Sequence, residues 1–196
     1  MIAHQRLLDT NGNEVCLFPL EYLRMSQGEH NLYALDFLGW GANGRIYDCP
    51  CYAPFSGEVV YTGNDHNMIY WSLNPVRLIN GLLSHVSILV AHDDTPPAAV
   101  GTRFTQGDLW YHTGNFGYSS GDHLHIEVAL GHVKWDTSGT HLKNPAHMWQ
   151  VMAVNDTVIS DGSGLNWRNY EGGITPTTDE KKHKFPWFIY SNRYRG

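Results

Sequence analysis

The chain of 196 residues is poor in cysteine, carries few basic residues and contains no long apolar run. Three cysteines are too few for the disulfide framework of a small secreted domain. A formal net charge of −6 argues against a general nucleic-acid binder. No segment is long and apolar enough for a membrane helix, and the first residues lack the apolar stretch of a secretory signal. We therefore expect no nucleic-acid partner, no membrane span and no signal peptide.

The three cysteines also give little support to a cysteine-based metal site. Cys49 and Cys51 stand in "CPC", closer together than the cysteines of a zinc knuckle. This spacing favours a reduced pair, or one bridge with Cys16, over a structural zinc ion. Histidine, in contrast, is abundant, with 12 residues against 13 lysines and arginines together. Because imidazole is a common metal ligand, this composition directs attention to a metal site.

Turn residues divide the chain into short segments rich in Val, Ile, Tyr and Trp, which predicts a mostly β protein with antiparallel pairing. A hairpin is expected around Gly131 and His132, and one helix over 144–153 with Asn144 as its N-cap. After it the sequence becomes polar and rich in glycine, as in a linker. The expected strands are 14–20, 33–39, 57–63, 68–73, 76–79, 86–91, 123–130 and 132–135.

The segment "GDHLHIEV" (121–128) places two histidines on a strand that otherwise reads as core. Residues i and i+2 of a strand point to the same face, so His123 and His125 share one face and Leu124 and Ile126 the other. One imidazole can then bind a metal ion while its neighbour moves protons. Taken alone, the pair is better explained by two half-exposed strand histidines.

Three other positions strengthen the metal hypothesis. Asp36 lies between Leu35 and Phe37, where a buried carboxylate needs a partner, either a metal ion or a salt bridge. His30 precedes that strand, and His92 ends the apolar run "SILVA", where a simple strand-end histidine is the alternative. Five glycines between positions 101 and 121 allow tight turns before the histidine pair.

Taken together, these elements resemble the lysostaphin-type zinc endopeptidases, a family of peptidoglycan hydrolases. The segments "YAPFSGEVVYTG" (52–63) and "VGTRFTQGDL" (100–109) are similar to two further segments of that family, so the likeness covers about residues 26–130. It implies a mostly β fold, the antiparallel β-sandwich of the lysostaphin-type peptidase (duplicated hybrid motif), with one or two short helices. It also implies a zinc metallopeptidase domain over 1–160, followed by a C-terminal linker and aromatic, basic extension over 161–196.

The resemblance implies a role for each candidate residue. His30, Asp36 and His125 would hold one Zn²⁺ and leave its fourth position to the water that attacks the scissile amide. His92 and His123 would serve, unligated, as general base and oxyanion stabiliser. The substrate would be a peptide cross-link of bacterial peptidoglycan, hydrolysed without a covalent intermediate. The residues that bind the substrate, and the bond that is cut, are not indicated.

One spacing departs from the family. Three residues usually separate the first histidine from the aspartate, whereas five separate His30 from Asp36 here. In an extended chain the two would stand about 20 Å apart, too far to share one ion. The chain must therefore turn back near Asn31, with Glu29 as the alternative ligand.

Two further expectations concern biological context. The "YALDF" strand resembles the first strand of phage-encoded members of the family, and together with the missing signal peptide this resemblance implies a phage-encoded enzyme, monomeric unless part of a virion. It would be either an endolysin released from the host cytoplasm to the cell wall or a virion-associated lysin. The alternative is a non-catalytic peptidoglycan-binding or virion structural module on the same fold. A biotinyl or lipoyl carrier is excluded, because no lysine precedes Lys134.

The last stretch, 179–196, is basic and aromatic. Trp187, Tyr190 and Tyr194 would either pack onto the sandwich or stack on wall sugars.

Overall fold

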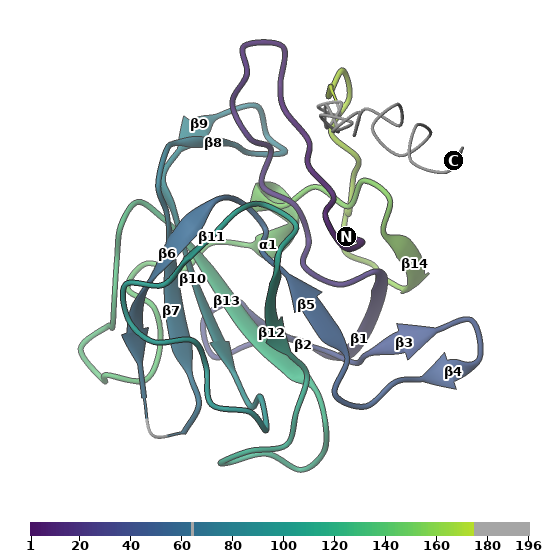
Figure 1. Ribbon diagram of the computed structural model, residues 1–196. Helices are drawn as coiled ribbons and strands as arrows, with labels where there is room; N and C mark the ends of the chain where they lie inside the picture. Colours follow the sequence, from purple (N-terminus) through teal and green to yellow (C-terminus); the bar gives the residue numbers. More distant parts are fainter. Residues whose placement is uncertain (64, 175–196) are drawn as a thin grey trace, which may run out of the picture.

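The computed structural model describes residues 1–63 and 65–174. Its centre is an eight-stranded sheet with the order β11-β6-β7-β10-β13-β2-β1-β14 (Figure 1). Neighbouring strands are antiparallel except for β1 and β14. The mostly β, antiparallel fold expected from the sequence is confirmed. In chain order the elements are β1 (Tyr22–His30), β2 (Ala34–Phe37), β3 (Trp40–Gly41), β4 (Gly44–Arg45), β5 (Pro50–Tyr52), β6 (Gly57–Thr62), β7 (Met68–Ser72), β8 (Val76–Arg77), β9 (Leu83–Ser84), β10 (Val86–Ala91), β11 (Arg103–Phe104), β12 (Leu109–His112), β13 (Leu124–Leu130), α1 (Met148–Val151) and β14 (Val158–Asp161).

A second, smaller layer covers one face of this sheet. It is the antiparallel pair β5 and β12, drawn in front of the sheet in Figure 1. Leu124 and Ile126 of β13 are fully buried and belong to the same apolar cluster as Cys51 of β5 and Tyr111 of β12. The core therefore lies between the two layers, as expected for a sandwich. Because side chains alternate along a strand, the histidines beside Leu124 belong to the opposite face.

That opposite face is apolar over part of its length. Ile69, Leu89 and Ala129 form a second cluster there with Leu142, which comes from the segment after β13. The rest of the face holds the polar groups described in the next subsection. The sheet thus supports a hydrophobic core on one side and carries a group of polar and titratable side chains on the other.

Several local expectations differ from the structure. The hairpin around Gly131 does not form, because Val133 donates its N–H to Oγ of Ser87 and the chain leaves the sheet. The helix is limited to Met148–Val151 and begins after His147 rather than Asn144. The backbone of 145–146 pairs with β13 at Val128 and Ala129, which prevents an earlier start.

Strand assignments near the N-terminus also differ. The segment 14–20 forms isolated bridges instead of a strand, and β1 is a strand that the pattern does not predict. β1 was missed because its "MSQGEH" portion is polar and contains a glycine.

All three cysteines are buried and free. Among the described residues no helix is long and apolar enough to cross a membrane. Beyond residue 160, Trp167 packs edge-on against Phe18 and Phe37, and Ile174 pairs with Leu8. The domain boundary at 160 stays a prediction, and Trp187, Tyr190 and Tyr194 lie outside the described residues.

Candidate metal centre

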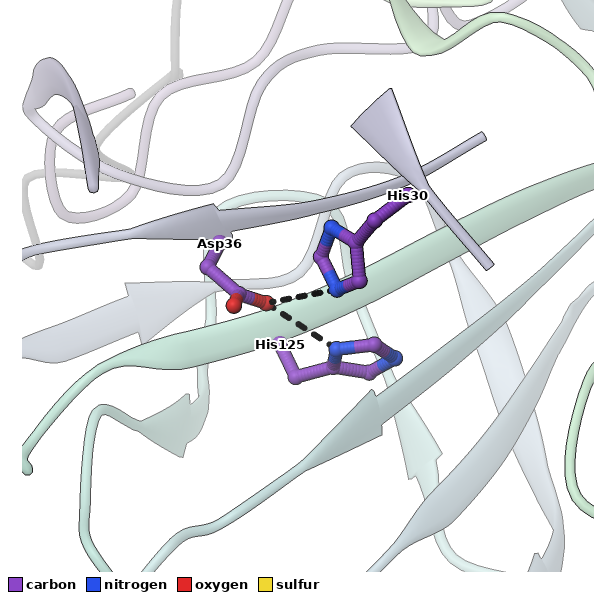
Figure 2. A group of neighbouring side chains, drawn as sticks. All are labelled: His30, Asp36 and His125. Carbon is purple, nitrogen blue, oxygen red and sulfur yellow. Dashed lines mark hydrogen bonds and ion pairs between the residues drawn. The ribbon is translucent and has the colours of Figure 1, made fainter. Parts of the chain in front are cut away.

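Neighbouring strands bring the predicted metal ligands together on the face of the sheet opposite the core. The β2–β13 ladder places His125 directly opposite Asp36, and the β10–β13 ladder places His125 opposite Ala91, next to His92. His30 ends β1, the strand on the other side of β2. Figure 2 shows both imidazoles turned toward the carboxylate of Asp36. Sheet register alone thus assembles residues that are up to 95 positions apart, from His30 to His125.

The distances suit a small metal ion. Oδ1 of Asp36 lies 3.0 Å from Nδ1 of His125 and 3.6 Å from Nε2 of His30. One ligand atom from each of the three residues lies within 4.8 Å of the other two. Tetrahedral zinc with bonds of about 2.0–2.1 Å to nitrogen and oxygen requires donors about 3.4 Å apart. The donor set His30 Nε2, Asp36 Oδ1 and His125 Nδ1 therefore fits zinc.

A left-handed turn resolves the long spacing between His30 and Asp36. Asn31, Leu32 and Tyr33 all have positive φ, at 41°, 62° and 75°. This tip reverses the chain so that His30 pairs with Ala34 across the ladder. Asp36 is then two residues further along β2, within reach of the His30 ring.

Glu29, the alternative ligand, points elsewhere. Its Oε1 lies 2.5 Å from Nδ1 of His147, just before α1. The His147 ring also packs on Tyr33, with ring centroids 4.0 Å apart. His147 thus holds Glu29 and Tyr33 on either side of the turn. His30 remains the ligand candidate on β1.

The two histidines expected to be unligated stand beside the donor set. Nδ1 of His92 lies 2.8 Å from the carbonyl oxygen of Phe116, and Nδ1 of His123 lies 2.7 Å from that of Gly121. A carbonyl oxygen can only accept, so each Nδ1 carries a proton. In the neutral form of either ring Nε2 is then an acceptor, and it makes no hydrogen bond to the described residues. Nε2 of His123 is 3.7 Å from Oδ2 of Asp36, and the His92 and His123 ring centroids are 4.6 Å apart.

Protonation of the site follows from burial and charge. Burial alone would raise the pKa of Asp36, but the hydrogen bond from His125 and the nearby histidine charges hold it below its ordinary value. Burial lowers the pKa of His92, which favours its neutral form. For His125, burial acts in the same direction but is outweighed by its two carboxylate neighbours, which raise the pKa to about 9. The site therefore favours a positive charge on His125, which lies between Asp36 and a second carboxylate.

That second carboxylate, Glu127, is a site residue that sequence reasoning missed. It is completely buried, and its Oε1 lies 3.4 Å from Nε2 of His125. Oε1 is also 2.6 Å from Nδ1 of His141, while Oε2 accepts the N–H of Leu142. A carboxylate that binds the far nitrogen of a metal-ligating histidine fixes its ring and tautomer. The signal was present in "HLHIEV", where Glu127 follows His125 at i+2 and so shares its face.

The candidate centre opens into a cleft. A cavity of about 490 Å³ lies over the donor set, and a second one of about 260 Å³ adjoins it. The first is lined by Gln27, His30, Asn31, Asp36, Tyr118, Ser119, Ser120, His123 and His125. These are the groups that a bound substrate would meet.

A second group of possible ligands has a structural explanation. Asp93 is buried, and its carboxylate accepts the N–H groups of Thr95 and His112. Its side-chain bond to His112 raises the pKa of that histidine. Asp48 completes the group but is exposed. The carboxylate of Asp93 is thus occupied in holding two backbone segments.

Comparison with known proteins gives relatives in sequence and in structure. No family model matches the chain. It is 28% identical over 174 residues to "Morphogenesis protein 1" of Bacillus phage B103, covering 81% of this chain. The chain spans 45% of the length of that relative.

Similar solved structures include the lysostaphin catalytic domain of Staphylococcus simulans, 19% identical with a TM-score of 0.41. That match covers 65% of this chain and 84% of the other. A zinc-containing peptidase of Vibrio cholerae is 17% identical with a TM-score of 0.42, covering 66% and 42%.

Proposed function

We propose that this protein is a zinc metalloendopeptidase that hydrolyses peptide cross-links of bacterial peptidoglycan. One observation carries the proposal: His30, Asp36 and His125 converge at the floor of an open cleft, beside two further histidines with free acceptor nitrogens. Three protein ligands with one open position are typical of catalytic zinc, whereas structural zinc has four. A merely structural ion would not need an open cleft or unligated histidines.

The roles of the residues follow from their positions. His30, Asp36 and His125 would hold the zinc ion, which when bound supplies a Lewis acid that polarises the scissile carbonyl and acidifies the attacking water. One of the two unligated histidines, His123 or His92, would accept the proton of that water at Nε2 and later return it to the leaving amine, and the other would stabilise the oxyanion. Their Nδ1 protons, held by backbone carbonyls, keep both rings in the required tautomer. A protonated imidazole next to the scissile carbonyl also stabilises the oxyanion.

The phage relative supports a place in phage biology. "Morphogenesis protein 1" is named for assembly, and the likeness covers 81% of this chain. We therefore favour a virion-associated lysin over a free endolysin. A virion-associated lysin would act on the host wall from outside. The same relative also supports a second candidate, a virion structural module without catalytic activity.

Digestion of purified peptidoglycan separates the two candidates. The zinc-loaded protein should release peptides whose masses define the bond, and chelation should abolish release. His125→Ala and Asp36→Ala should lose both zinc and activity, whereas His123→Ala should keep zinc and lose activity. His4→Asn, an exposed histidine outside the cleft, is the matched control and should keep both. An intact wall in the presence of bound zinc would instead support the structural module.

A further inference from the structure

Arg45 places a positive charge beside a second cavity that adjoins the candidate metal centre. The β3–β4 hairpin projects from the body of the protein (Figure 1), and its last residue, Arg45, lines the cavity of about 260 Å³. That cavity shares Gln27, Asp36, Ser120 and His123 with the larger one. The two cavities are therefore arms of one cleft, with the candidate centre where they meet.

Among the residues that the structure describes, the Arg45 side chain is held in place without a carboxylate partner. Its Nη2 donates to the backbone carbonyl oxygen of Asp122 over 2.5 Å, and its guanidinium lies 4.9 Å from the centre of the Tyr47 ring. The carboxylate of Asp122 is already used, because it accepts from Oγ1 of Thr113 and the N–H of Asp48. Arg45 is thus positioned by neutral groups.

Three other arginines differ from Arg45 because each of them forms an ion pair with a carboxylate. Arg6, Arg77 and Arg103 pair with Glu14, Asp9 and Glu58 respectively. Within residues 1–63 and 65–174, Arg45 makes no such pair. Arg45 is exposed at the wall of the cleft, and its side chain makes one hydrogen bond to the described residues. Its remaining N–H groups can therefore bind an anion of planar, forked geometry.

We propose that Arg45 binds a carboxylate of the substrate peptide while the scissile bond lies at the metal centre. Guanidinium and carboxylate match as a bidentate pair, and Ser26, Gln27 and Ser120 add neutral polar groups along the same arm. The inference rests on the proposed function and specifies its substrate class. The cross-link would carry a carboxylate near the cleaved bond, which disfavours an uncharged glycine bridge. The carboxylate is either the chain end of the stem peptide or the side chain of an acidic residue.

Paired synthetic peptides test this assignment. One peptide has a free chain-end carboxylate and an amidated side chain, a second has the reverse, and a third has both groups amidated. Wild-type protein should prefer one of the two acidic peptides over the neutral one by about 10–100-fold in kcat/KM, mainly through KM. Which acidic peptide is preferred identifies the source of the carboxylate.

Variants connect the preference to Arg45. Arg45→Gln should lose it at unchanged zinc content, and Arg45→Lys should restore part of it through charge alone. Arg103→Gln, an exposed arginine on β11 at the far edge of the sheet, should keep the full preference. A preference that survives in Arg45→Gln, or equal use of all three peptides by the wild type, would overturn the inference.

A binding measurement keeps this inference separate from the proposed function. His123→Ala with bound zinc should bind the acidic peptide more tightly than the neutral one, by a similar factor, in a calorimetric titration. Absence of cleavage by the wild type with such a binding preference would remove the peptidase proposal but keep the carboxylate site. Equal binding of all peptides would remove the carboxylate site.

Discussion

Nδ1 of His141 lies 2.6 Å from Oε1 of Glu127, and this bond joins the segment after β13 to a carboxylate with no exposed surface. The same carboxylate faces Nε2 of His125, so the orientation of a proposed metal ligand depends on a residue 16 positions away, His141. Charge-assisted hydrogen bonds of this kind are stronger than neutral ones. Replacement of Glu127 or His141 therefore tests whether residues that do not bind the metal themselves affect metal binding.

Replacement of Glu127 by Gln should weaken zinc binding by about 10–100-fold, as expected for a lost outer partner of a ligating histidine. Competition with a chromophoric chelator measures the affinity. Glu58→Gln, which removes a carboxylate on β6 at the far side of the sheet, should leave the zinc affinity unchanged. Equal affinities for Glu127→Gln and wild type would show that His125 needs no outer partner.

Gly114 is expected to position both unligated histidines. Its backbone exchanges two hydrogen bonds with His123, and a Cβ there would clash with the carbonyl oxygen of His92. Gly114→Ala should therefore lower kcat at least 10-fold while the zinc content stays at one per chain, because the added Cβ would meet the backbone of His92 to Asp94 and none of the three ligands. Gly121→Ala, where a Cβ meets open space, is the control. Parallel measurement of kcat and zinc content would contradict the prediction if both fell together.

The turn at Asn31–Tyr33 predicts an unusual response at an exposed site. Leu32 is 60% exposed and has a φ of 62°, a region that β-branched residues strongly avoid. Leu32→Val should lower the free energy of unfolding by about 1–2 kcal/mol, and Leu32→Gly should be neutral or stabilising. Leu82→Val, at a similarly exposed leucine without positive φ, should change stability by less than about 0.5 kcal/mol. Urea unfolding measures all three, and equal effects of the two valine variants would be inconsistent with a left-handed turn.

Asp9 should contribute to acid unfolding. Burial alone would raise its pKa, but hydrogen bonds from Asn13, Arg77 and Asn11 lower it to about 2. Because this pKa lies below that of an unfolded aspartate, about 3.9, the ionised group stabilises the fold above pH ~4. That contribution is lost as the pH falls toward about 2. The unfolding free energy of wild type should therefore fall more steeply between these pH values than that of Asp9→Asn. Asp65→Asn, at an exposed carboxylate, is the control and should follow wild type.

Strand periodicity accounts for much of what the sequence could predict. Alternation in "HLHIEV" separates His123 and His125 from Leu124 and Ile126, and the structure buries the leucine and isoleucine in the core. The same rule extends to Glu127, which could have been identified from its i+2 position. The proximity of Asp36, in contrast, depends on which strands are neighbours in the sheet. Only the family resemblance supplied that information beforehand.

Other features could not be predicted because tertiary contacts override local preference. Leu32 and Tyr33 rarely adopt positive φ, so only Asn31 marked the turn that returns His30 to the site. His141 lies in a polar segment that gives no sign of its contact with a buried carboxylate. The helix at Met148–Val151 is shortened because pairing of 145–146 with β13 competes with helix formation.

The pairing of His30 with Ala34 at the end of the β1–β2 ladder has a practical consequence for engineering. The distance between His30 and Asp36 is set by the cross-strand pairing of β1 and β2. It does not depend on the number of residues in the turn between these strands. Leu32 points into solvent at that tip and carries none of the donor atoms. Leu32 is therefore a suitable insertion point for a reporter peptide or an affinity tag, next to Asn31, which lines the cleft, yet outside the donor set. Motif searches that require a fixed gap between these two ligands would pass over chains built in this way.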